Sequence, residues 1–356
     1  MNLTEIKKRN RKNTLVIIAL ILAVVAAGIY CLFVGSSNMT FSDVLRALFK
    51  KGTRGQNKIL WDIRMPRVFA AIIAGAGLSV AGLIMQTTLS NAMAAPSTLG
   101  VTNAAVFGAN LAIIGGSGGL LEIGKNVTIG SFSASASPYT TSIIAFVFAT
   151  ASVLLVLGLC SARGFSPNVV VLAGVAIGAI WTAATTLLQY FATDESLSAA
   201  VVWSFGDLSD ATYDQVYIML ALVLVGVLFF MLMAWKYNAL LSGEATAKTM
   251  GIRVEALRFV SLLFASMITA VCVSFLGVIG FVGVICPHIT KRLLGQDHRI
   301  TIPASCLTGS LLLLLADTLS RTLGKGVALP VGAVTAMLGA PFFLFIIFSR
   351  KESHGC

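Results

Sequence analysis

The sequence predicts an all-α, polytopic membrane protein with about ten transmembrane helices, and three observations carry this prediction. The chain of 356 residues is 57% hydrophobic and only 11% charged, whereas a soluble domain has roughly 25% charged residues. Its mean hydropathy is +0.92. Several apolar runs reach the length of about 20 residues that a helix needs to cross a bilayer. Residues 1–356 are therefore predicted to form a single transmembrane domain.

The net charge of +11 does not indicate a nucleic-acid partner. Most of the 25 lysines and arginines lie at the ends of apolar runs, where they set topology and meet lipid headgroups. The six cysteines form no Cys-x-x-Cys pair, so we interpret them as small apolar residues rather than disulfides or metal ligands. No cofactor and no metal site are predicted.

The N-terminal part of the chain sets the predicted topology. Residues 1–13 are rich in Lys and Arg and are expected in the cytoplasm. The apolar run that follows, 14–34, is longer than the core of a signal peptide and is predicted as the first span. Residues 35–67 are predicted as an external loop, in which 41–49 has the apolar spacing of an amphipathic helix at the membrane interface.

The later apolar runs complete the predicted bundle. Spans are expected at 70–89, 98–114, 139–160, 169–191, 216–235, 259–276, 302–319 and 331–348, with a further segment between Gly277 and Lys291. Both termini are then cytoplasmic. Small residues four apart predict faces for close helix packing; these faces are Ala71, Gly75 and Ser79 in the second span, Gly174 and Gly178 in the fifth, and Gly332 and Ala336 in the tenth.

A polar stretch, 240–258, interrupts the apolar runs in the second half of the chain. Its basic residues place it on the cytoplasmic side. Glu244 and Lys248 have the i,i+4 spacing of a helical ion pair, and Gly251 follows as a helix C-cap. We predict a two-helix elbow that projects from the membrane, either as an ordinary connector or as a docking element for a cytoplasmic motor.

Other function classes fit the sequence less well. The glycine-rich segment 119–126 resembles a phosphate-binding loop, but Asn126 replaces the Ser or Thr that would reach magnesium. The three histidines lie at or beyond span ends, which gives no constellation for an intramembrane enzyme. An ion-coupled secondary transporter is the alternative. It needs ionisable groups deep in the spans, and Asp317 is the only carboxylate in an apolar run, with Arg321 as its i+4 partner.

Seven short blocks occur in the order found in one known family. They are Arg64-Met-Pro-Arg67, Ala74 to Gly82 with Gln86, Leu99-Gly100-Val101, Gly243-Glu244-x-x-Ala247-x-x-x-Gly251, Gly280-Phe-Val-Gly283 with Pro287-His288-Ile289, Ala316-Asp317-Thr318 with Arg321, and Leu329-Pro-Val-Gly332 with Gly339-Ala-Pro341. Together they resemble the FecCD family, the permeases of type II ABC importers for ferric siderophores, haem and cobalamin. The chain departs from the family at Asn91-Ala92-Met93-Ala94, which lacks a turn-fixing proline.

The resemblance implies a fold like that of the cobalamin-importer permease, in the cell (inner) membrane of a bacterium or archaeon. It also implies three protein partners. Cytoplasmic ATP-binding subunits would dock on the elbow at Gly243, Glu244, Ala247 and Gly251. An extracytoplasmic substrate-binding protein would dock on Arg64, Arg67 and Arg321. A second permease subunit, identical or related, would complete the pathway, which Gly174, Gly178, Gly332 and Ala336 would line.

The same resemblance implies that the permease has no catalytic residue and that ATP is hydrolysed by the partner subunits. An iron–siderophore chelate is the first expected cargo, because it is the commonest in the family, followed by cobalamin and haem. Family pathways are lined by small and apolar residues, so cargo specificity is expected to reside largely in the binding protein.

Overall fold

The computed structural model describes residues 3–35, 39–116, 138–162, 165–323 and 329–349, and these segments are almost entirely helices and short connections. Within them, seven helices are long and apolar enough to cross a membrane, and two shorter apolar helices, Val101–Gly116 and Val331–Leu344, accompany them. The all-α membrane class is thereby confirmed, while the count of about ten spans stays a prediction. The glycine-rich segment 119–126 lies outside the described residues.

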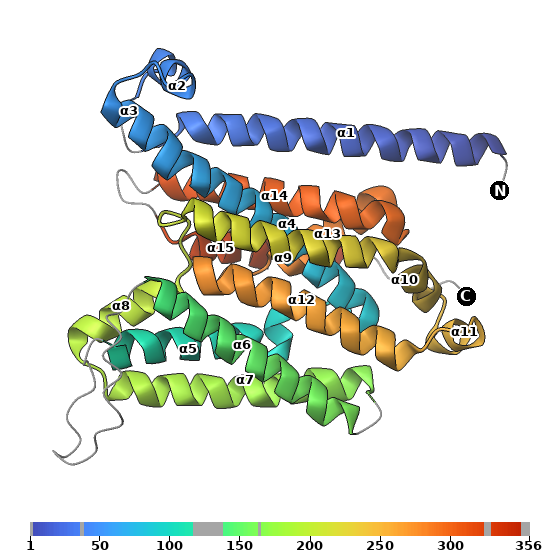
Figure 1. Cartoon of the computed structure of the whole chain (residues 1–356). Coiled ribbons are helices and arrows are strands. Elements are labelled where there is room, and N and C mark those ends of the chain that lie inside the picture. Colours follow the sequence, from blue (N-terminus) through green and yellow to red (C-terminus); the bar gives the residue numbers. More distant parts are fainter. Residues whose placement is uncertain (1–2, 36–38, 117–137, 163–164, 324–328, 350–356) are drawn as a thin grey trace.

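One helix, α4 (Met65–Thr88), runs through the centre of the bundle (Figure 1). It contacts α9 (Tyr213–Leu232), α12 (Val254–Leu276), α13 (Val282–Leu294) and α14 (His298–Leu323). A Cβ added at Gly75 would collide with the backbone of Gly309, and one added at Gly82 would collide with that of Gly283. The hydroxyls of Ser79 and Ser305 lie 2.7 Å apart. The small face predicted for the second span thus brings neighbouring backbones together.

A second group of helices packs beside this centre. It comprises α5 (Val101–Gly116), α6 (Pro138–Ser161), α7 (Pro167–Tyr190) and α8 (Asp194–Ser204), and it forms the lower layer in Figure 1. The prediction that the third span begins at residue 98 was wrong. Pro96–Leu99 forms a 3-10 turn, η2, and Gly100 takes a left-handed φ of 71°, so the helix begins only at Val101.

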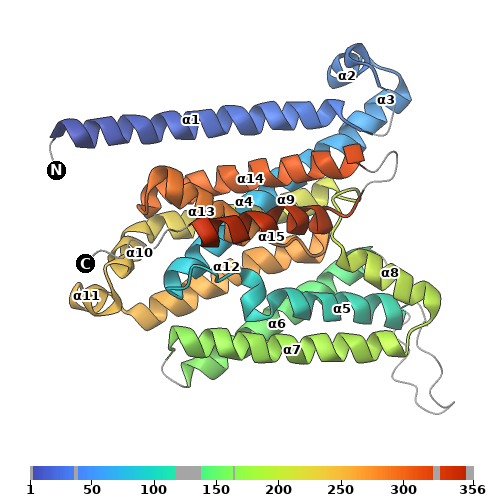
Figure 2. The same cartoon turned by 180° about the vertical axis from the view of Figure 1, so that it is seen from behind.

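The first helix, α1 (Leu3–Phe33), lies along the opposite side of the bundle (Figures 1 and 2). Only 17% of its most apolar window is buried within the chain, which suits a helix that faces lipid on most sides. It packs mainly against α14, where the Cys31 thiol lies 2.9 Å from the hydroxyl of Thr318.

The connection from α1 to α4 contains the predicted amphipathic helix, α2 (Phe41–Leu48). Thr40 and Asp43 form a capping box at its start, which satisfies two otherwise unpaired amides. Val44 and Ala47 are buried against Leu60. After α3 (Arg54–Lys58), a π-helical turn, Ile59–Arg64, leads directly into α4.

The segment after α12 differs from its prediction. Residues 277–281 form a connection rather than part of a span, with Gly277 at φ 70° and Phe281 in a left-handed conformation at φ 66°. The helix α13 therefore begins only at Val282. Gly277 meets the backbone of Trp203 and Gly206, and Gly283 meets the backbone of α4, whereas Gly280 has open space around it.

Candidate functional site

The polar stretch forms two short helices, α10 (Ala234–Leu241) and α11 (Glu244–Thr249), which protrude beyond the ends of α9 and α12 (Figure 1). We call residues 234–253 the elbow. It begins earlier than the predicted residue 240, because the chain leaves the α9 helix at Met233. The predicted end at 258 falls inside α12, which begins at Val254. The start of α1 lies at the same end of the bundle as the elbow (Figure 1).

Helix α11 ends in a Schellman motif. Gly251 has a φ of 79°, and its amide donates to the carbonyl of Lys248 at 3.0 Å. The amide of Ile252 donates to the carbonyl of Ala247 at 3.1 Å, and both of these side chains are buried. This pattern is the hydrogen bonding and apolar contact of the motif. The predicted cap at Gly251 is confirmed, and it holds α11 against the start of α12.

Ion pairs tie the elbow to α12. The Lys248 ammonium lies 3.0 Å from the Glu244 carboxylate, as its i,i+4 spacing predicted, and 2.9 Å from that of Glu255. The Arg258 guanidinium lies 3.1 Å from Glu244. Hydrogen bonds from Lys248 and Arg258 hold the pKa of Glu244 below its usual range, so these contacts persist until the pH falls through that lowered value.

Arg258 is a buried junction that the sequence did not reveal. Its side chain is 2% exposed. Besides Glu244, it donates at 2.8 Å to the carbonyl of Thr88, at the end of α4, and at 2.8 Å to that of Phe165, between α6 and α7. One guanidinium therefore joins the elbow to both layers of the bundle. In the sequence, only the position of this charge next to an apolar run indicates such a role.

A second buried charge cluster lies at the opposite end. Asp317 on α14 is fully buried, and its two carboxylate oxygens each lie 2.7 Å from a guanidinium nitrogen, one of Arg67 and one of Arg321. Arg67 also donates to the hydroxyl of Ser209 at 2.7 Å. The sequence predicted the pair of Asp317 with Arg321, but not the third member, Arg67 on α4.

Two arginines of this end also cap α1. Arg321 donates to the carbonyls of Cys31 and Val34 at 3.0 and 2.7 Å, and Arg64 donates to that of Leu32. The last carbonyls of a helix lack partners within the helix and attract positive charge. Arg64, Arg67 and Arg321 thus lie at the same end of the bundle, but their side chains are largely buried and engaged within the chain. Their role in docking stays a prediction.

The glycines predicted to line a pathway make close helix contacts within the chain. Gly174 packs against the backbone of Thr98 and Leu99, and Gly178 packs against Gly100. On α15 (Val331–Ser349), Gly332 meets backbone carbonyls of the two nearby connections, and Ala336 is half-buried. The packing part of the interpretation is supported, while the pathway itself stays a prediction.

Three of the seven family blocks therefore lie in two structured places, the elbow at one end and the arginine cluster at the other. Residues 19–349 match the FecCD transport family. The chain belongs to this family. FecCD permeases are transmembrane transport subunits and not enzymes, and separate subunits hydrolyse ATP for them.

Several FecCD relatives match along most of their length. A "putative ABC transporter permease protein" of Methanocaldococcus jannaschii is 44% identical over 97% of this chain and 97% of its own. The hemin transport system permease of Yersinia pestis is 32% identical over 91% and 93%. A solved structure of a "putative metal-chelate type ABC transporter" in an inward-facing conformation superposes with a TM-score of 0.80 at 26% identity, covering 94% of this chain and 98% of that one.

The cap of α11 offers a first test of the elbow. Gly251→Val is expected to cost about 1–2 kcal/mol, because a branched residue must adopt the left-handed backbone, whereas Gly251→Asn should cost less, since asparagine tolerates it. The space around an added Cβ is open, so the pair isolates the backbone effect. Thermal unfolding of the purified variants measures it. Equal stability of the valine and asparagine variants would contradict the assigned cap.

Proposed function

We propose that this chain is the permease subunit of an ATP-binding-cassette importer that moves an iron–siderophore-type metal chelate into the cytoplasm, with ATP hydrolysed by separate subunits. Support comes from family membership and from relatives named for hemin, cobalamin and iron(3+)-hydroxamate transport. These names share a class of cargo, the large metal chelate. Among them, the iron–hydroxamate relative favours our choice.

The observation that carries the proposal is the exposed and rigidly anchored elbow. Glu244 and Lys248 are each nearly half exposed, while Ala247 and Ile252 beneath them are buried. A protruding helix fixed by a capped end and a buried arginine is suited to receive force from a partner. We propose that the ATP-binding subunits dock here, on the cytoplasmic side, and that the contact includes Gly243, Glu244 and Lys248.

The alternative, an ion-coupled secondary transporter, finds less support. Ion coupling uses an ionisable group that can gain and lose its charge within the membrane. Among the described residues, Asp317 is the only fully buried carboxylate, and it is held between two guanidinium groups. A carboxylate whose two oxygens are both engaged in ion pairs suits a fixed structural role.

The remaining parts of the proposal concern the other partners. A substrate-binding protein would dock at the end of the bundle that contains Arg64, Arg67 and Arg321, outside the cell. A second permease subunit would face α7 and α15, where Gly174, Gly178, Gly332 and Ala336 bring backbones close to the proposed pathway. The chain would then lie in the cell membrane with both termini in the cytoplasm.

Reconstituted uptake tests the proposal. The permease, its ATP-binding subunit and its binding protein are placed in liposomes with ATP inside, and a ferric hydroxamate, hemin and cyanocobalamin are offered in turn. We expect ATP-dependent accumulation of the ferric hydroxamate, unaffected by a proton uncoupler. Uptake that continues without ATP and collapses with the uncoupler would favour the secondary transporter. ATP-driven uptake of only cyanocobalamin or hemin would refute the siderophore assignment.

A further inference from the structure

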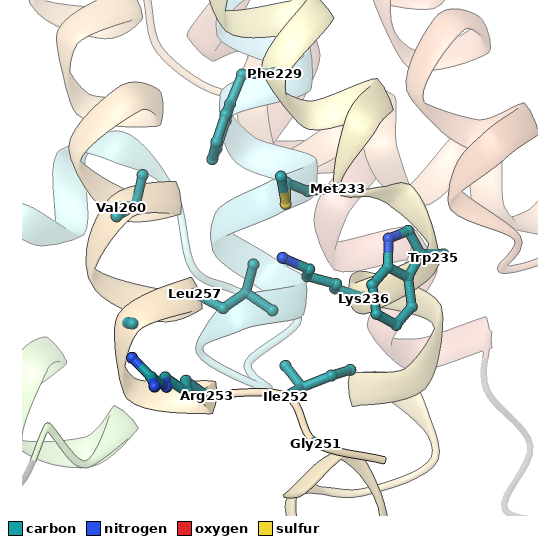
Figure 3. A pocket seen from close by; sticks show the side chains of 10 residues that line it. Phe229, Met233, Trp235, Lys236, Gly251, Ile252, Arg253, Leu257 and Val260 are labelled. Atoms are coloured by element: carbon teal, nitrogen blue, oxygen red, sulfur yellow. The ribbon is translucent and has the colours of Figure 1, made fainter.

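A cavity of about 400 Å³ lies between the elbow, the C-terminal end of α9 and the N-terminal end of α12 (Figure 3). Its lining comprises Phe229, Met233, Trp235, Lys236, Gly251, Ile252, Arg253, Ala256, Leu257 and Val260. The candidate spans Tyr213–Leu232 and Val254–Leu276 both end at this level. The cavity therefore straddles the boundary between the apolar spans and the polar elbow, which is the depth of the lipid headgroups.

The cavity wall changes from apolar to basic along the bundle. Phe229 and Val260 lie at its deep end, within the spans, and Arg253, the last residue of the elbow, lies at the other end with its side chain directed away from Lys236 (Figure 3). Lys236 extends its ammonium group into the middle of the cavity (Figure 3). Trp235, whose ring lies 5.6 Å from that ammonium, is half exposed at the boundary. Tryptophan at this depth is typical of the membrane interface.

The two basic residues of the cavity have no acidic partner among the described residues. The carboxylates of the elbow region, Glu244 and Glu255, form ion pairs with Lys248 and Arg258. Lys236 forms no ion pair in the part of the chain that the structure describes, and neither does Arg253. The cavity thus combines the positive charge of Lys236 at its middle with an apolar wall that leads toward the membrane interior.

We propose that this cavity binds one anionic phospholipid, with its phosphate near Lys236 and the start of an acyl chain against Phe229 and Val260. Basic pockets between transmembrane helices recognise acidic lipid headgroups in this way. The apolar wall at the deep end of the cavity favours a lipid over a phosphate compound that has no acyl chain. The bound lipid fills the space beneath the elbow, so it braces α10 and α11 against the bundle. This inference depends on the membrane location of the chain and not on its cargo.

Lipid retention by the purified, full-length protein tests the proposal. The protein is delipidated in detergent and titrated with dioleoyl phosphatidylglycerol or dioleoyl phosphatidylcholine, and bound lipid is counted by native mass spectrometry. We expect one phosphatidylglycerol to bind more tightly than phosphatidylcholine. Lys236→Gln should weaken that binding about 5-fold, the effect of one basic residue near a lipid surface.

A charge-matched control uses Arg299→Gln, an exposed basic residue near the same end of the bundle. This control should bind phosphatidylglycerol as tightly as the unmodified protein. Equal weakening in both variants, or equal affinity for the two lipids, would overturn the site. Displacement of the lipid by millimolar glycerol phosphate would mean that the headgroup alone is recognised, against the proposal. Unchanged lipid binding with weakened attachment of the ATP-binding subunit would assign the cavity to a protein interface instead.

Discussion

Replacing Asp317 by asparagine is expected to destabilise the protein by about 3–5 kcal/mol, the cost of leaving buried charges without their partner. Asparagine keeps the shape of the side chain but removes the negative charge that faces Arg67 and Arg321, each at 2.7 Å. Both arginine side chains are only 7% exposed, so water cannot replace the lost interaction. Unfolding of the detergent-solubilised protein, followed by heat or denaturant, measures the loss.

The matched control is Asp210→Asn, which removes an exposed carboxylate near the same end of the bundle and should change stability by less than about 0.5 kcal/mol. A cycle with Arg67→Gln adds a second criterion. Because the two residues share one interaction, the double variant should be more stable than the sum of the single losses implies. Strict additivity, or an Asp317→Asn loss as small as that of the control, would contradict the assigned cluster.

Replacing Arg258 by methionine should have an effect of similar size, about 3–5 kcal/mol, with a further loss of coupling through the elbow. The substitution retains an apolar chain of similar length but leaves the carbonyls of Thr88 and Phe165 without their donor. Each unsatisfied buried acceptor costs about 1–3 kcal/mol. Unfolding measures the stability loss, and ATP hydrolysis by the assembled transporter with and without cargo measures the coupling.

Glu244→Gln distinguishes the contact of Arg258 with the elbow from its contacts with the carbonyls of Thr88 and Phe165. It weakens the contacts of Glu244 with Arg258 and with Lys248, at a carboxylate that is 42% exposed, and such pairs contribute about 0–1 kcal/mol each. We therefore expect Glu244→Gln to retain nearly full stability while reducing the coupling of hydrolysis to cargo. Similar stability losses in Glu244→Gln and Arg258→Met would show that the contacts to Thr88 and Phe165 contribute little.

Local sequence patterns predicted the structural features that depend on residues close together in the sequence. The helical pair of Glu244 with Lys248 and the cap at Gly251 each depend on residues within one or two turns, and both are confirmed. The helix α2 was likewise predicted from the apolar spacing of 41–49. The membrane class followed from the lengths of the apolar runs, because the bilayer imposes that length on any spanning helix.

Contacts between distant segments escaped prediction because no local spacing encodes them. Arg67 and Asp317 are 250 positions apart, and Arg258 and Thr88 are 170 apart. The start of the third span was misplaced because Pro96 and Gly100 favour a turn that its apolar composition obscured. The docking and pathway roles stay predictions, since they concern partners that the geometry of one chain does not test.

The hydrogen bonds that Arg321 donates to the end of α1 can form only late in the synthesis of the protein. The last carbonyls of α1, at Cys31 and Val34, are bonded by Arg321, which leaves the ribosome almost 290 residues after them. Until then, α1 remains in the bilayer through its own hydropathy, which reaches 3.0 in its most apolar window, and through the bond from Arg64 to the Leu32 carbonyl. The helix α1 is therefore fully secured only after α14 has been synthesised, when most of the chain has already entered the membrane.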